Sequence, residues 1–279
     1  MKIFDIHIHS CHEMTETTFD AQRLLKKMEA EGIYGGGVIS GAPKFWGGDR
    51  VYTPKERLDE VLRCCDGYQD RVYPILWVHP DEDGTLDVVE EAAERGIMGF
   101  KIICNNFYVY EDKSMELLEK IVTTKKPVLF HSGILWDDSV SCVYNRPLHW
   151  EAVCRIPGLR FSLAHCSWPW YDEAIALYGK LWFNHRKDPY KYSEMFLDLT
   201  PGTPVPYRKD LFTKLFGCGY NIEDNLLWGT DNWADDYEPT MTQQWLQLDE
   251  GIFDEMGISQ ETRAKIYYEN RKRFFQVAE

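Results

Sequence analysis

Hydrophobic and polar positions follow two alternating patterns along this chain. Short runs rich in β-branched and aromatic residues are typical of strands, and they are separated by longer segments whose apolar residues stand three and four apart, as in helices. We expect strands at 3–9, 34–40, 72–78, 97–103, 127–131, 159–165, 195–199 and 225–231. We expect helices at 19–31, 54–66, 85–95, 113–124, 147–155, 170–179, 207–217 and within 259–277.

The repeat of these units predicts the fold class. The eight expected strands start about every 32 residues, the length of one strand, one helix and their connections. This alternation covers about 250 residues without a linker or low-complexity tract, which predicts an α/β protein with one (β/α)8 TIM barrel, a single domain over residues 1–279. A doubly wound open sheet is the alternative. It is disfavoured because no glycine-rich phosphate-binding fingerprint follows the first strand.

Composition narrows the class of protein further. The chain has 279 residues, 44% hydrophobic and 14% aromatic, enough for a large packed core. A formal net charge of −14 argues against nucleic acid and anionic membranes as partners, since both need a basic surface. We expect a cytoplasmic protein, because no window holds roughly 18 uncharged apolar residues and no signal-peptide pattern is present. The eight cysteines lack CxxC pairs and regular spacing, which indicates neither a zinc ribbon nor a disulfide framework.

Candidate chemistry stands at the carboxyl ends of the expected strands, where a (β/α)8 barrel builds its active site. The first strand reads IFDIHIH, and side-chain alternation predicts Asp5, His7 and His9 on one face. An isolated His-x-His pair could equally belong to a half-solvated strand whose imidazoles face water. The residues at the other strand ends decide between this interpretation and a functional site. They carry Lys101 on the fourth strand, His131 on the fifth, His165 on the sixth and Asp231 on the eighth. Strand ends converge, so these distant residues can meet around one ion.

Imidazole nitrogens and a carboxylate oxygen are ligands of Zn2+ or a similar divalent ion, and a catalytic site leaves one position open for water. Such an ion lowers the pKa of bound water toward roughly 7. Asp231 can then take the proton of the water, and His165 can orient the substrate or stabilise its developing oxyanion.

The motifs DIHIH, GFKI, PVLFHSG, LAHCS, WGTD and IYYENRKRFF stand in the order seen in the amidohydrolase superfamily. More closely, the chain resembles the amidohydrolase-related (amidohydrolase 2) branch of TIM-barrel metal-dependent hydrolases, which includes aminocarboxymuconate-semialdehyde decarboxylase. The resemblance spans about residues 3–275. It implies His7, His9, His131 and Asp231 as ligands of one divalent ion, with Zn2+ as the expected metal. It also implies Asp231 as the proton acceptor and His165 as a catalytic or ligating histidine.

Three further residues are candidates for substrate binding. In binuclear members of the superfamily a lysine at the position of Lys101 is carboxylated and bridges two metals. Here GFKI is typical of the mononuclear branch, so we expect Lys101 to face a substrate carboxylate. A carboxylated Lys101 that bridges two metals is the alternative. If Lys101 faced outward, Phe100 and Ile102 would point inward. Arg146 either clamps a carboxylate or forms a salt bridge in its loop. Trp233 belongs to a group that predicts an apolar cleft, although each member singly is more often a packing residue; the others are Trp46, Trp77, Trp136, Trp168 and Trp170.

Family resemblance does not fix the reaction, because the branch contains hydrolases, decarboxylases and lactonases, some without metal. We expect a metal-dependent hydrolase of a small amide, ester or lactone, and a homodimer is left open. One alternative is a non-oxidative decarboxylase of a small unsaturated or aromatic carboxylic acid. Another is a non-catalytic metal-binding barrel. The remaining histidines have no position in the motif order, and we assign no role to His12, His79, His149 and His185.

Overall fold

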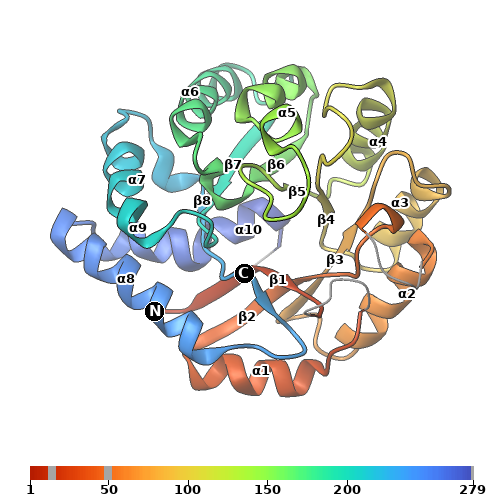
Figure 1. Ribbon diagram of the computed structural model, residues 1–279, viewed down its shortest axis with the longest axis horizontal. Helices are drawn as coiled ribbons and strands as arrows, with labels where there is room; N and C mark the ends of the chain where they lie inside the picture. Colours follow the sequence, from red (N-terminus) through yellow and green to blue (C-terminus); the bar gives the residue numbers. More distant parts are fainter. Residues whose placement is uncertain (12–16, 47–51, 278–279) are drawn as a thin grey trace.

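Nine strands, each parallel to its neighbours, form one curled sheet in the part of the chain that the computed structural model describes, residues 1–11, 17–46 and 52–277 (Figure 1). The order across the sheet is β8-β7-β6-β5-β4-β3-β2-β1-β9. The strands are β1 (Ile3–His9), β2 (Ile33–Ile39), β3 (Val72–Trp77), β4 (Gly99–Ile102), β5 (Val128–Phe130), β6 (Arg160–Leu163), β7 (Glu194–Asp198), β8 (Leu226–Leu227) and β9 (Asn232–Trp233).

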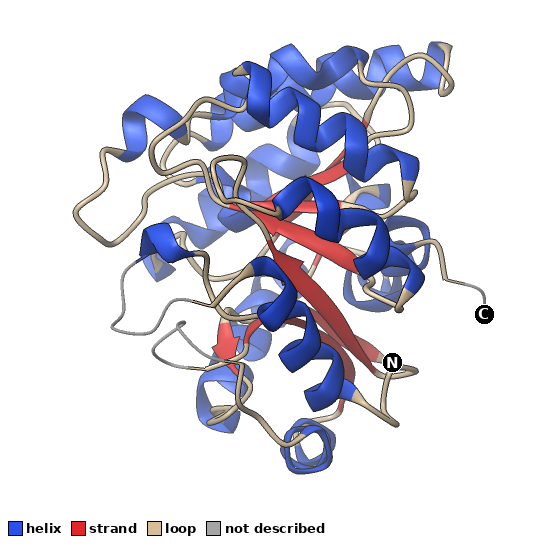
Figure 2. Cartoon of the chain, turned by 90° about the vertical axis from the view of Figure 1, so that its right-hand side faces the viewer, coloured by secondary structure: helices blue, strands red, loops and turns tan. Residues whose placement is uncertain are grey.

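Helices follow the strands and surround the sheet (Figures 1 and 2). The α-helices are α1 (Ala21–Ala30), α2 (Pro54–Cys65), α3 (Thr85–Glu94), α4 (Asp112–Thr123), α5 (Ser141–Tyr144), α6 (Tyr171–Lys187), α7 (Val205–Gly217), α8 (Pro239–Met256), α9 (Gln260–Ala264) and α10 (Asn270–Phe275). Short 3-10 segments are η1 (Lys44–Trp46), η2 (Pro147–Arg155), η3 (Ala164–Ser167) and η4 (Ile222–Asp224), and η5 (Lys265–Glu269) is a π-helical turn. The start of α2 is determined by the local sequence, because Thr53 and Glu56 form a capping box there.

The predicted α/β alternation is confirmed, but the predicted closed barrel is not. The expected eighth strand, 225–231, is divided: β8 pairs with β7, whereas β9 pairs with β1. Between them the chain leaves the extended conformation, and Asp231 has a φ of +58°. No ladder joins β8 to β9 in the described residues, so the sheet is a curled half-barrel. Single backbone contacts, such as Ile6 N–H to Trp228 O at 3.1 Å, link β1 to the segment after β8.

The helices differ from the prediction at two expected segments and at one helix that the sequence pattern does not predict. The segment 147–155 is helical, but it forms the 3-10 helix η2. The long helix α8 was not expected, because its buried face includes the polar residues Thr242 and Asp249 beside Leu246 and Phe253, which interrupts the apolar spacing. The predicted helix within 259–277 is interrupted by the π-helical turn η5 between α9 and α10.

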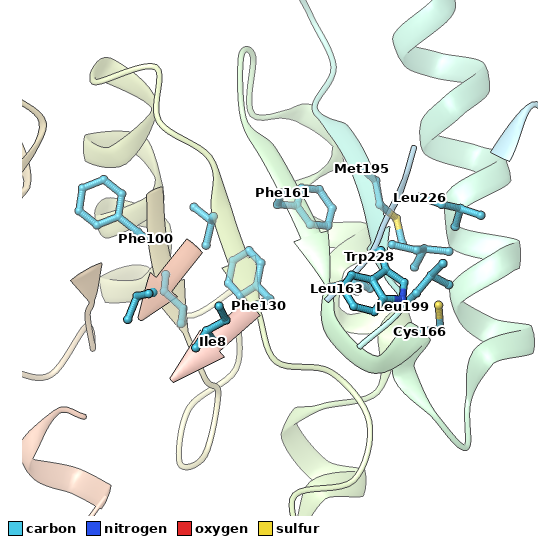
Figure 3. Packing of buried hydrophobic residues seen from close by; sticks show 14 of the residues in the cluster. Ile8, Phe100, Phe130, Phe161, Leu163, Cys166, Met195, Leu199, Leu226 and Trp228 are labelled. Atoms are coloured by element: carbon cyan, nitrogen blue, oxygen red, sulfur yellow. The ribbon is translucent and has the colours of Figure 1, made fainter. Parts of the chain in front are cut away.

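Alternate strand positions pack into two hydrophobic clusters. The outer cluster lies between the sheet and its helices, and Figure 3 shows part of it, including Ile8, Phe100 and Phe130. The inner cluster takes the opposite strand positions, such as Phe4, Ile6 and Leu129, together with Phe274 and Phe275 of α10. Ile6 and Ile8 therefore pack on different sides, and the pairing of β1 with β2 shifts register between Asp5 and Ile8. The predicted simple alternation along β1 is broken at this point.

None of the helices in the described part of the chain has the length and apolar character that crossing a bilayer requires. All eight cysteines are free thiols, in line with the absence of a disulfide framework from the sequence pattern.

Candidate active site

A cavity of about 240 Å³ contains every histidine, lysine and aspartate expected at a strand end. Most of its polar residues lie in the last part of β1 and β4, directly after β5 and β6, or between β8 and β9, as the carboxyl ends of parallel strands predict. Its apolar wall comes mainly from η1 and the loop after β5. The lining residues are His7, His9, Trp46, Lys101, Ile103, His131, Ile134, Leu135, Trp136, Asp137, His165, Pro201, Gly202 and Asp231.

Three of these residues form a group that could hold a metal ion. The ligand atoms of His7, His9 and Asp231 lie within 4.8 Å of one another. The Oδ1 atom of Asp231 is 3.5 Å from Nε2 of His7 and 3.2 Å from Nε2 of His9. Two imidazole nitrogens and a carboxylate oxygen are a donor set that Zn2+ and similar divalent ions take, so these residues fit such an ion.

His7 is fully buried and is held from both sides of its ring. Its Nδ1 atom lies 2.8 Å from Oδ2 of Asp198, and its Nε2 atom lies 3.2 Å from Nζ of Lys101. Burial, with a smaller contribution from the Lys101 charge, lowers the pKa of His7 to about 4. Burial alone would raise the pKa of Asp198, but the charge and hydrogen bond of His7 bring that pKa below its usual value. His7 is therefore a neutral imidazole beside an ionised carboxylate at neutral pH.

The position of Asp231 depends on contacts with β1. Its backbone N–H donates to His7 O at 2.9 Å, and its φ of +58° is uncommon for a residue other than glycine. The preceding residue, Thr230, donates its N–H and hydroxyl to the carboxylate of buried Asp5, at 2.9 and 2.5 Å. Gly229 is required by close packing, because a Cβ atom there would lie 2.9 Å from Thr200 Cγ2 and 3.1 Å from His7 Cβ.

The carboxylate of Asp231 is partly exposed and ionised at neutral pH. Its side chain is 34% exposed. Burial acts to raise its pKa, but the hydrogen bond of His9 and the neighbouring histidines together hold that pKa well below the usual value. Asp5 differs: burial raises its pKa to about 7, and it does not line the cavity. The structure therefore separates Asp5 from the face that His7 and His9 share, contrary to the predicted alternation.

Lys101 faces the cavity, which excludes the outward alternative because Phe100 and Ile102 lie in the outer cluster. Burial lowers the pKa of Lys101 to about 8, against the opposing charges of Asp231 and Asp198. The ammonium form still predominates at pH 7, so a cation lies beside the His7 ring.

The rings of His131 and His165 lie 5.0 Å apart, centroid to centroid, and the ring of His165 lies 5.5 Å from that of His7. The Nδ1 atom of His165 is 2.8 Å from Pro201 O, and Gly202 leaves no room for a side chain against the ring. The Nε2 atom of His131 is buried and has no hydrogen-bond partner in the described residues. Burial, followed by the charge of His165, lowers the pKa of His131 well below its usual value. His131 is thus a neutral imidazole, though it lies outside the compact donor group.

Two predicted substrate-binding residues do not line the cavity. The guanidinium of Arg146 is 44% exposed and forms an ion pair with Glu173 of α6, which is the alternative that the sequence left open. Trp233 packs its ring 5.5 Å from the ring of His9 instead of facing the cavity. Among the other tryptophans, Trp46 and Trp136 do line the cavity. His12 lies outside the described residues.

Sequence reasoning missed the residues that orient the histidines. Asp198, Thr200 and Pro201 lie close together at the end of β7, in the stretch FLDLTPG. A carboxylate at a strand end was an available signal, but its pairing with His7, 191 positions away, depends on the curl of the sheet.

Comparison with known proteins decides the family, because the sequence profile of the amidohydrolase family matches residues 48–277. The chain belongs to the amidohydrolase family. The matched range begins after β1, so the His7 and His9 pair lies outside it. No protein among those with curated functions matches this amidohydrolase. Specific similarity to aminocarboxymuconate-semialdehyde decarboxylase stays a prediction.

Solved structures resemble this amidohydrolase in fold at low sequence identity. A probable 2-pyrone-4,6-dicarboxylic acid hydrolase from Acinetobacter baumannii, with citric acid bound, has a TM-score of 0.64 and 13% identity, covering 99% of this chain and 100% of the other. A D-hydantoinase has a TM-score of 0.61 and 13% identity, with coverage of 97% and 70%. A dihydroorotase from Campylobacter jejuni has a TM-score of 0.59 and 14% identity, with coverage of 100% and 84%.

Proposed function

We propose that this amidohydrolase uses one divalent metal ion, with Zn2+ as the expected metal, to hydrolyse a small amide, ester or lactone. The observation that carries the proposal is the group of His7, His9 and Asp231, whose donor atoms lie within 4.8 Å of one another in the cavity. Family membership and hydrolase neighbours of the same fold support it. His131 as a fourth ligand stays a prediction.

In this proposal His7, His9 and Asp231 hold the ion and the rest of the cavity handles the substrate. When bound, such an ion supplies Lewis acidity, lowering the pKa of a water and polarising a carbonyl. The Asp231 carboxylate is ionised at neutral pH, so it can accept a proton from the attacking water. His165, with Nδ1 held by Pro201 O, directs its Nε2 toward the cavity, where it can orient the substrate carbonyl.

Lys101 favours substrates that carry a carboxylate. It is the one lysine or arginine among the described residues that line the cavity, and its ammonium is buried. A substrate carboxylate would neutralise that charge in a site with little water, where the pairing is stronger than at the surface. Trp46, Leu135 and Trp136 supply an apolar wall for the body of the substrate.

Metal content tests the first part of the proposal. Protein purified without chelator and analysed by elemental mass spectrometry should carry about one divalent ion per chain. The double variant His7→Ala with His9→Ala should lose it, because two of the three donors are removed. His185→Ala is the matched control, since that ring contacts Tyr192 O outside the cavity. Unchanged metal content in the double variant would refute the site.

Products test the reaction. A panel of small lactones, amides and esters, with and without a carboxylate, should include substrates that are hydrolysed with 18O from labelled water entering the product. Release of CO2 from a carboxylic acid without incorporation of 18O would identify the decarboxylase instead. Tight metal binding without turnover of the panel or of candidate acids would favour the non-catalytic barrel.

A further inference from the structure

The segment that begins at the last residue of β7 contacts two histidines of the cavity, one in β1 and one after β6. Asp198 Oδ2 lies 2.8 Å from Nδ1 of His7, and Pro201 O lies 2.8 Å from Nδ1 of His165. We call residues 198–202 the β7 acceptor segment, because both contacts are made by oxygen atoms. Within this segment Asp198 and Thr200 are fully buried.

The chemistry of these oxygens fixes where each histidine carries its proton. A peptide carbonyl can only accept, so Nδ1 of His165 must be the donor toward Pro201 O. At His7 the same conclusion follows from Asp198, because a carboxylate only accepts and its Oδ2 lies 2.8 Å from Nδ1. Thr200 supports this arrangement: its N–H donates to Asp198 Oδ1 at 2.7 Å and its hydroxyl donates to the same oxygen. Oδ2 is left to accept from His7.

We propose that Asp198 is a positioning residue that holds His7 in the Nδ1–H tautomer, so that its Nε2 lone pair is directed into the cavity, where Lys101 Nζ lies 3.2 Å away and Asp231 Oδ1 lies 3.5 Å away. The Nε2 atom of His7 is the atom that lies 3.5 Å from Asp231 Oδ1, on the side of the ring opposite Asp198. A hydrogen on that nitrogen would remove the donor electron pair that an ion needs. The consequence for metal binding rests on the proposed function, but the tautomer itself does not.

Replacing Asp198 by asparagine should reverse this tautomer without changing the shape of the side chain. Thr200 presents two donors to the Oδ1 position, so the amide oxygen of asparagine must stay there. The amide NH2 group then faces Nδ1 of His7 and requires it to accept. The proton of the imidazole moves to Nε2, as in other enzymes where an Asp-to-Asn change selects the wrong histidine tautomer. The opposite amide orientation would set NH2 against the Thr200 N–H.

Nitrogen-15 spectroscopy of the metal-free protein tests this directly. Protein labelled with 15N-histidine and stripped of metal by chelator should show His7, assigned by its absence in His7→Gln, protonated at Nδ1. Asp198→Asn should show His7 protonated at Nε2. Thr200→Val removes a hydroxyl whose Oγ1 lies 3.3 Å from Nδ1 of His7, but the backbone N–H of residue 200 still orients the Asp198 carboxylate, so this variant should keep the Nδ1–H form. Thermal melting accompanies each variant as the check of folding.

Zinc affinity, measured by competition with a chromophoric chelator, is the second readout. Asp198→Asn should bind Zn2+ about 10–100-fold more weakly than the wild type, while Thr200→Val should stay within about threefold of it. A wild-type His7 protonated at Nε2, or an Asp198→Asn protein that keeps the Nδ1–H form, would overturn the inference. If Asp198→Asn does not fold, the wild-type spectrum alone decides. A wild type with the Nδ1–H form that binds no Zn2+ would refute the proposed function and leave the inference standing.

Discussion

Gly202→Ala tests whether His165 is held by close packing. A Cβ atom at position 202 would lie 2.6 Å from His165 Cβ, 2.8 Å from Cγ and 3.0 Å from Nδ1. Carbon atoms pack at about 3.5–4.0 Å, so the ring or the segment must move by about 1 Å. The ring cannot turn aside freely, because Nδ1 is held by Pro201 O. Overpacking of this kind costs about 1–3 kcal/mol, and a shift of about 1 Å at a catalytic group can lower turnover about 100-fold.

The assay compares thermal unfolding of Gly202→Ala and Gly251→Ala. For a chain of this size 1 kcal/mol corresponds to roughly 2 °C, so Gly202→Ala should lower the melting temperature by about 2–6 °C. Gly251 lies in α8, and a methyl group added there would meet nothing within 4 Å. Alanine at that position should raise the melting temperature by about 2 °C, since it favours the helix by about 1 kcal/mol. If Gly202→Ala melts at or above the wild-type temperature and keeps full turnover, His165 is not held as we describe.

Three further outcomes are expected. Asp231→Asn should fold, judged by circular dichroism, but lose about 10²–10⁴-fold in turnover with an identified substrate, because the proton acceptor is gone; a retained rate would remove that role. Arg146→Ala should leave the melting temperature and kcat/KM nearly unchanged, since its ion pair with Glu173 is exposed to solvent; a rise in KM confined to carboxylate substrates would restore the carboxylate clamp. Burial lowers the pKa of His79 in the folded protein below its usual value of 6.5, and its Nδ1 accepts the N–H of Asp81 at 3.1 Å. On acidification this histidine therefore takes up a proton more readily in the unfolded chain than in the folded one. Urea unfolding should therefore show stability falling as the pH drops through 6.5, and less steeply in His79→Gln.

Much of the fold was predictable because each strand and helix carries a local pattern. The first strand is found at 3–9 as expected, and the helix at 54–66 differs from α2 by one residue. The last strand was not predictable in detail. The extended pattern of 225–231 continues through Gly229 and Asp231, but tertiary contacts with Asp5 and His7 draw this part toward β1. Helix α8 was not predictable for a related reason. Its buried face includes Asp249, which is tolerated there only because Arg208 of α7 forms an ion pair with it.

The site was predictable to the extent that residue type and strand end determine it. His7, His9, Lys101, His131, His165 and Asp231 all line one cavity; their roles as ligands and catalytic groups stay predictions. The contacts that orient the histidines were not predictable. Asp198 stands at a strand end like many carboxylates, and only its contact with the ring of His7 across the sheet gives it a role. Arg146 shows the converse: its partner, Glu173, belongs to the next long helix and no spacing rule connects them.

The joining of β1 to the segment around Asp231 has a consequence for biosynthesis. Asp5 and Thr230, which hold the two parts of the donor group together, are 225 positions apart. Thr230 is therefore synthesised 225 residues after Asp5, and contacts of such long range form late in folding. A nascent chain that has not yet reached Asp231 presents His7 and His9 without that carboxylate, so the three donor groups of the proposed metal site come together only after this late contact has formed.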